Sequence, residues 1–194
     1  MADQKISAMP TAATLTGAEL VPLVQSGANV KATLSAIKAV LRTYGGFSDT
    51  NNQTGDITQG TAISFDTIDV NDGVTVQNSS EITVPTTGIY NLQFSIQFEN
   101  VGNSQHDATV WLRINGSDLA NSSTQYTIPA RKSAGIYGYN VTMLTFLLEL
   151  NANDYVEIFW VPESTEVSIQ AKPASVSPAY PAIPSIIAVM LQVG

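Results

Sequence analysis

The sequence contains no cysteine, a single histidine, and only 12% charged residues among its 194 positions. Without cysteine, the chain can form no disulfide, thiol nucleophile, iron–sulfur cluster or thiolate zinc site. No apolar run approaches the roughly 18 residues of a membrane-spanning helix, and the first ten residues lack the basic-then-apolar pattern of a secretion signal. We therefore expect no membrane partner, and a fold stabilised by packing or assembly.

The charges that are present are mostly acidic and are unevenly distributed. The formal net charge is −8, and because residues 1–44 carry +2, residues 45–194 carry −10. An acidic surface repels phosphates, so nucleic acid is not an expected partner. Most polarity comes from Ser, Thr, Asn and Gln, which lose water at lower cost than ions do. This composition favours a chain in two parts, with a surface that a protein partner covers.

Residues 1–30 show no sustained helical or strand periodicity, because Pro10, Gly17, Pro22 and Gly27 interrupt them. We predict an extended arm over these residues, with a disordered tail as the alternative. Residues 33–44 predict a short amphipathic helix capped by Thr33 and ended by Gly45-Gly46. The arm and helix, residues 1–46, would anchor the chain to another protein through apolar residues: Ile6, Met9, Leu15, Leu20, Val21, Leu23, Val24, Leu34, Ile37 and Leu41.

Residues 47–60 are rich in Asn, Thr, Gly and Asp and are predicted to be a linker. From residue 61 onward the apolar residues recur with a period of two. The clearest strand covers residues 90–99, and the Asn115-Gly116 pair after residues 110–114 predicts a hairpin turn. Eight or more such strands predict an all-β fold, an antiparallel jelly-roll sandwich over residues 61–194.

The C-terminal segment SIIAVMLQV is apolar on both faces of the strand that it predicts. An uncharged apolar strand at a sheet edge would promote aggregation, so we expect a central strand covered on both sides. One side can meet the sandwich core. A domain of this size has one interior, so the simplest cover for the other side is a second copy of the chain.

Several elements of the β region resemble the jelly roll of complement globular heads and tumour-necrosis-factor-like domains. They are Phe65, the Pro85-x-x-Gly88-x-Tyr90 step, the Asn115-Gly116 turn, and Asn153-Asp154-x-Val156. The resemblance covers about two-thirds of the chain. It implies a tight homotrimer, for which the expected interface residues are Tyr90, Ile187, Val189, Leu191 and Val193.

The N-terminal stretch resembles the attachment segment that begins many fibre and virion proteins of tailed bacteriophages. The matching pieces are Lys5–Ser7, Leu15–Leu20 and Pro22–Gln25. This resemblance implies a virion protein, made in the host cytoplasm, whose N-terminal arm binds the particle while a C-terminal trimer projects outward.

Catalytic and metal-binding alternatives have weaker support in the sequence. His106 lies beside Asp107 and near Ser104, but neighbouring side chains on an extended chain point apart and no oxyanion hole is evident. The acidic stretch with Asp66, Asp69 and Asp72 lacks the spacing of a dedicated calcium loop. We predict no enzyme activity, no cofactor and no resident metal. Five Asn-x-Ser/Thr sequons are what this composition gives by chance, at Asn52, Asn78, Asn115, Asn121 and Asn140.

The leading prediction is a homotrimeric capsid decoration or cement protein on the capsid surface. Its partner would be the major capsid protein or another shell protein. The alternative is a head-fibre or tail-fibre tip that recognises a host surface glycan or protein through residues 100–108 and 117–133. In that alternative, exposed aromatics such as Trp111, Trp160, Tyr137 and Tyr139 stack on sugar rings, although strand aromatics more often belong to a core or an interface. A hydrolase acting on capsule polysaccharide is a third class.

Overall fold

The computed structural model describes residues 14–39 and 43–194. The chain divides into two compact units, Met1–Arg42 and Thr43–Gly194. Among the described residues, no helix has the length and apolar character needed to cross a bilayer.

The described part of the first unit is a β-hairpin followed by a helix of about one and a half turns. Strand β1 (Leu20–Gln25) pairs antiparallel with β2 (Ala28–Thr33), and α1 (Leu34–Ala39) follows at once. The hairpin turns at Ser26-Gly27, where φ is +52° and +78°, the signs that a type I′ turn requires. Thr33 caps the helix as expected, because its Oγ1 accepts a hydrogen bond of 3.1 Å from the Ala36 amide.

Two predictions for this unit are therefore wrong. Residues 20–33 form a hairpin instead of an extended arm, because the Ser26-Gly27 turn lets two six-residue strands pair. The helix covers Leu34–Ala39 instead of residues 33–44. Its last predicted residue, Tyr44, begins a strand, and residues 40–42 lie outside the described residues.

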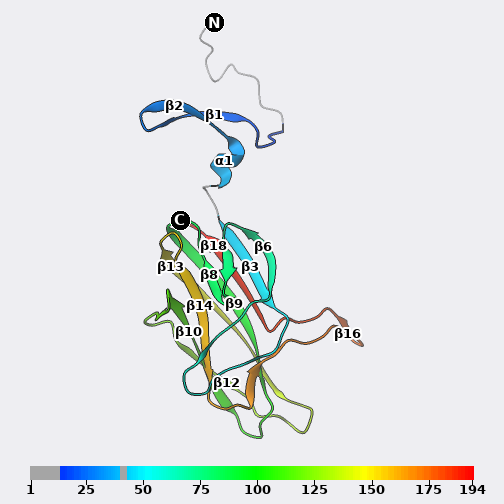
Figure 1. Ribbon diagram of the computed structural model, residues 1–194. Coiled ribbons are helices and arrows are strands. Elements are labelled where there is room, and N and C mark those ends of the chain that lie inside the picture. Colours follow the sequence, from blue (N-terminus) through cyan, green and yellow to red (C-terminus); the bar gives the residue numbers. More distant parts are fainter. Residues whose placement is uncertain (1–13, 40–42) are drawn as a thin grey trace. The chain divides into compact units, whose positions relative to one another are not determined.

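The second unit is a sandwich of two seven-stranded antiparallel sheets (Figure 1). The first sheet contains β3 (Tyr44–Asp49), β4 (Gln53–Thr54), β6 (Thr67–Asp72), β9 (Gly88–Asn100), β13 (Gly138–Leu150), β15 (Val167–Ile169) and β18 (Ile186–Gln192). The second contains β5 (Thr61–Ala62), β7 (Thr75–Gln77), β8 (Glu81–Thr83), β10 (His106–Ile114), β11 (Ser117–Asp118), β12 (Thr124–Ile128) and β14 (Tyr155–Pro162). A small hairpin, β16 (Ser175–Val176) with β17 (Ala179–Tyr180), projects from the body between β15 and β18 (Figure 1).

The strand order confirms the expected all-β class and is compatible with a jelly roll. In the first sheet β18 lies between β3 and β9, and β13 pairs along the full length of β9 on the other side. In the second sheet β10 lies between β12 and β14, and β14 continues to β8. The first and last strands of the second unit, β3 and β18, thus become neighbours, as in Greek-key arrangements.

The core lies between the two sheets. Alternate residues of β9 point into it, and Leu92 and Ile96 have no exposed surface. From the second sheet Trp160 enters the same space, with its ring centroid 5.7 Å from that of Phe98. These residues show the period of two that the sequence predicts for residues 90–99.

The predicted linker over residues 47–60 is wrong. Strand β3 ends at Asp49, inside that range, and Phe47 is fully buried in the core. The ring of Phe47 fills the space above Gly45, where a Cβ would come within 2.4 Å of it, and the side chain of Val70 lies over Gly46 on the other side. The two glycines therefore allow close packing within a strand, a use that the sequence does not distinguish from a helix stop.

Candidate assembly surface

The outward side of the first sheet is an exposed surface without a charged residue at its centre. The register places the outward side chains of three adjacent strands opposite one another. We call this surface the uncharged face, and it consists of Val141, Met143, Thr145 and Leu147 of β13, Asn91, Gln93, Ser95 and Gln97 of β9, and Ile187, Val189 and Leu191 of β18.

Strand β18 has the alternation that the sequence predicts. Ile186, Ala188 and Met190 have no exposed surface, whereas Val189 is 45% exposed and its neighbours on the same side are similar. The strand is also central, as expected, because it pairs with β3 and β9. Its inner side belongs to the core, and its outer side is bare in the single chain. Val193 follows the strand and is exposed as well.

Tyr90 does not lie on this surface, which corrects its assignment to a subunit interface. It is 0% exposed within its own chain, because residue 90 belongs to the inward-pointing set of β9. Its hydroxyl group donates to the Thr86 carbonyl oxygen at 2.8 Å and lies 3.1 Å from the Thr43 hydroxyl group. Tyr90 therefore ties the start of β9 to Thr43, the first residue of the second unit, and to Thr86 in the loop before the strand.

Strand β13 contributes further apolar residues to this surface, beyond those expected from the sequence. Val141, Met143 and Leu147 point outward, and Met143 is 73% exposed. The signal was present in the sequence, because residues 141–148 alternate as β18 does, with apolar residues in both sets. Two apolar rows, on β13 and β18, thus flank the polar row of β9.

The polar row of β9 consists of amides and a serine, and one of its atoms has no partner. Asn91 lies opposite Leu147 on one side and Leu191 on the other. Its Oδ1 is buried by these neighbours and accepts no hydrogen bond within the described residues. A buried acceptor without a donor costs free energy in the folded chain.

The described anchoring candidates lie in the first unit. Leu15, Leu20 and Val24 are exposed. Val21, Leu23, Leu34 and Ile37 are partly covered, whereas Ile6, Met9 and Leu41 lie outside the described residues. The exposed side chains of Leu20 and Val24 lie on the same face of β1, so the hairpin presents apolar residues on that face.

Glu19 joins the turn before this hairpin to the helix. Its carboxylate accepts hydrogen bonds from the Thr16 amide at 2.7 Å, the Thr16 hydroxyl group at 2.8 Å and the Gly17 amide at 2.7 Å. Its own carbonyl oxygen accepts from the Leu34 amide at 2.8 Å. The hydrogen bond from the Thr16 backbone is the main reason that the pKa of Glu19 falls from 4.5 to about 2.

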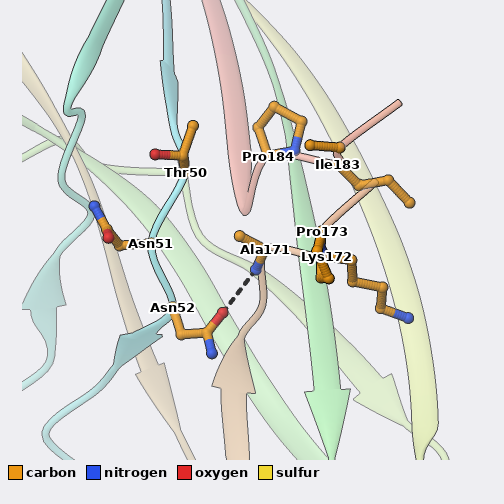
Figure 2. A pocket seen from close by; sticks show the side chains of 9 residues that line it. Thr50, Asn51, Asn52, Ala171, Lys172, Pro173, Ile183 and Pro184 are labelled. Atoms are coloured by element: carbon orange, nitrogen blue, oxygen red, sulfur yellow. Dashed lines mark hydrogen bonds between the residues drawn. The ribbon is translucent and has the colours of Figure 1, made fainter. Parts of the chain in front are cut away.

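A hollow of about 400 Å³ lies where the projecting hairpin joins the sandwich (Figure 2). Its lining comprises residues 50–52, 171–173 and 182–184. Asn52 accepts a hydrogen bond of 2.9 Å from the Ala171 amide across the hollow. The ionisable side chain at its rim, Lys172, extends away from Asn52, with Nζ 3.4 Å from the centroid of the Tyr139 ring. These groups tie the hairpin base to the sheet.

The residues considered for catalysis point to different partners. His106 Nε2 lies 3.2 Å from a Glu166 carboxylate oxygen, whereas the Asp107 carboxylate accepts from the Thr127 hydroxyl group at 2.7 Å. Asp66, considered for calcium, accepts from Thr50 at 2.6 Å and from Asn51 at 2.8 Å. Within residues 14–39 and 43–194, no three His, Asp or Glu residues are placed to hold a metal ion.

Comparison of the chain with protein-family models and with curated proteins found no match. The candidate surface is therefore interpreted from its own geometry.

Proposed function

We propose that this protein is a non-enzymatic structural protein of a bacteriophage particle. In this proposal it is a homotrimeric decoration or cement protein that docks on the capsid surface through its N-terminal unit and stabilises the shell. The uncharged face is the observation that carries the proposal. The sequence resemblances described above supply the trimeric state and the particle.

The uncharged face has the composition of a surface that is covered in the functional state. Its apolar rows on β13 and β18 are long and exposed, and an apolar patch of this kind on a soluble domain marks an interaction site. The polar row between them can lose water at modest cost because it carries no ion.

The N-terminal unit has the properties of an attachment element. It is compact by itself, it carries net positive charge against an acidic sandwich, and it presents Leu20 and Val24 to solvent. Three such units on one trimer would bind one particle together. Modest contacts per unit then give strong retention, because the second and third contacts form at high effective concentration.

The first test is the mass of the full chain in solution. Light scattering after gel filtration at micromolar concentration should give the mass of three chains. A single mass of one chain would contradict the assembly, and with it the proposed role on the particle.

The second test concerns attachment and leaves the sandwich intact. The full chain with Leu20→Asp and Val24→Asp should remain trimeric but lose binding to particles assembled without this protein, measured by co-sedimentation. Val176→Asp is the matched control, because Val176 is 95% exposed on the projecting hairpin. Undiminished binding by the double variant would contradict the attachment role of β1.

A further inference from the structure

A second hollow lies on the outward side of the other sheet, away from the uncharged face. Its volume is about 390 Å³. Strand β10 supplies Thr109 and Trp111, and the chain that follows β10 supplies the rest of the lining: Asp118, Leu119, Ala120, Asn121 and Ser123. It therefore combines one large aromatic ring with a carboxylate, a carboxamide and two hydroxyl groups.

The ring of Trp111 is held in a fixed position. Its Nε1 donates a hydrogen bond of 2.8 Å to Asp118 Oδ1, and its ring packs on Phe159 with the centroids 5.6 Å apart. Arg113 lies over the other aromatic ring, 4.4 Å from the Phe159 centroid, and its Nε is 3.3 Å from the same Asp118 oxygen. A ligand would thus meet a preformed aromatic surface.

The loop opposite Trp111 is also fixed, by a buried serine. Ser122 is 2% exposed, and its hydroxyl group donates to the Leu119 carbonyl oxygen at 2.7 Å and accepts from the Leu112 amide at 3.0 Å. The residues on either side, Asn121 and Ser123, are exposed and line the hollow. Their polar groups are therefore presented from a rigid loop.

We infer that this hollow binds a neutral saccharide. A pyranose has a face of C–H groups, which pack on the negative face of an indole ring, and a rim of hydroxyl groups that both donate and accept. Asp118 Oδ1 accepts the hydrogen bond from Trp111, which leaves Oδ2 as an acceptor, while Asn121 supplies both a donor and an acceptor.

The charges around the hollow favour a neutral ligand. Arg113 pairs with Asp118, so neither ion is left to attract a charged group. The net charge of −10 on residues 45–194 further disfavours phosphates and acidic sugars. The inference does not depend on the trimer, because the hollow and the uncharged face lie on opposite sheets.

The experiment uses the full chain and the methyl glycosides of glucose, galactose, mannose and N-acetylglucosamine as probes, at millimolar concentrations. The chain has two tryptophans, and Trp160 is fully buried. In a proton–nitrogen NMR spectrum, at least one glycoside should shift the indole signal of Trp111 and leave that of Trp160 unchanged. If no glycoside in the panel shifts the Trp111 signal, the inference is overturned.

Three variants locate the binding. Trp111→Ala should weaken binding about tenfold or more, the equivalent of about 1.4 kcal/mol. Asn121→Gly should weaken it several-fold without disturbing the fold, because φ at Asn121 is +63° and glycine adopts this value freely. Tyr180→Ala removes an exposed tyrosine elsewhere and should have no effect. Unchanged binding in both hollow variants, or loss in Tyr180→Ala, would overturn the assignment.

Discussion

The two sheets of the sandwich share one core but differ in what they present to solvent. The outward side of β10 and β14 carries ions and pairs them, with Arg113 opposite Glu157 and near Asp118. The uncharged face on the first sheet carries none at its centre and presents Met143, Val189 and their neighbours instead. Because both sheets belong to the same acidic unit, composition alone does not explain the difference.

The difference supports the proposal that a sister copy covers one face while the other stays in solvent. Ions on an exposed strand keep water bound and prevent sheets from associating, which suits a surface that stays in solvent. Their absence from one face allows that face to be buried without leaving unpaired charges. Substitutions that exchange these properties between the two faces test this interpretation.

The largest effect is expected from a charge placed in the middle of the uncharged face. Val189→Asp should convert trimers to single chains, because burying a carboxylate without a partner costs several kcal/mol per copy. Light scattering at micromolar concentration would measure the change. Gln125→Asp adds the same charge to the outward side of the second sheet and should leave the mass unchanged. A trimeric Val189→Asp variant would contradict the interface.

A large effect on stability is expected in the shared core. Ile96→Ala should lower the free energy of unfolding by about 2–5 kcal/mol, because Ile96 is fully buried between the sheets. Denaturant unfolding at a fixed concentration measures this change.

The unfolding midpoint of the natural chain should also rise with chain concentration, since assembly stabilises the folded state by mass action. A midpoint independent of concentration would indicate that assembly and folding are not coupled.

A smaller change is expected from Asn91→Leu at the centre of the uncharged face. The substitution places an apolar side chain between Leu147 and Leu191, so more apolar surface is buried on assembly and association should tighten by about tenfold. The variant should also form more than one oligomeric species, because a polar residue in an apolar interface helps to specify a single state. Sedimentation velocity reports both. Weaker association would contradict an apolar interface centred on this residue.

The smallest effect is expected in acid, at the half-buried Glu19. Because the pKa of Glu19 is lowered to about 2, its stabilising hydrogen bonds are fully present above about pH 4.5 and are lost as the pH falls through 2. The protection factors of the Thr16 and Gly17 amides, which are corrected for the intrinsic pH dependence of exchange, should therefore fall as the pH approaches 2, and Glu19→Gln should remove this fall. Protection that is already lost near pH 4.5 would contradict the lowered pKa.

The sequence predicts the long strands well because inward and outward side chains alternate regularly along them. Alternation in residues 90–99 and 186–193 gives both the strands and the orientation of their side chains. The same reasoning misses β3, because a strand that packs through Gly45 and Gly46 has no side-chain alternation to detect. It also misses the first hairpin, although Ser26-Gly27 between two short strands is a recognisable turn signal.

The candidate surface was only half predictable for a related reason. The outward row of β18 is predictable from the sequence because both faces of this strand are apolar, so that one apolar row must point away from the core. The interface assignment of Tyr90 is wrong because it follows the resemblance to trimeric jelly rolls, whereas alternation groups Tyr90 with the buried Leu92 and Ile96. The pairing of β13 with β9, which brings Met143 and Leu147 to the same face, is a contact between distant segments that no local pattern contains.

The two ends of the sandwich suit this protein to displaying foreign peptides as insertions or fusions. The Gln192 amide donates to the Thr43 carbonyl oxygen at 2.9 Å, and the Ile89 amide donates to the carbonyl oxygen of Gly194 at 2.7 Å. The polypeptide thus enters and leaves at one end of β9, and the loop after Asn100 lies at the other, roughly 40 Å away at about 3.3 Å per residue. A peptide inserted between Asn103 and Ser104 would be displayed at the tip, whereas a fusion after Gly194 would emerge at the base.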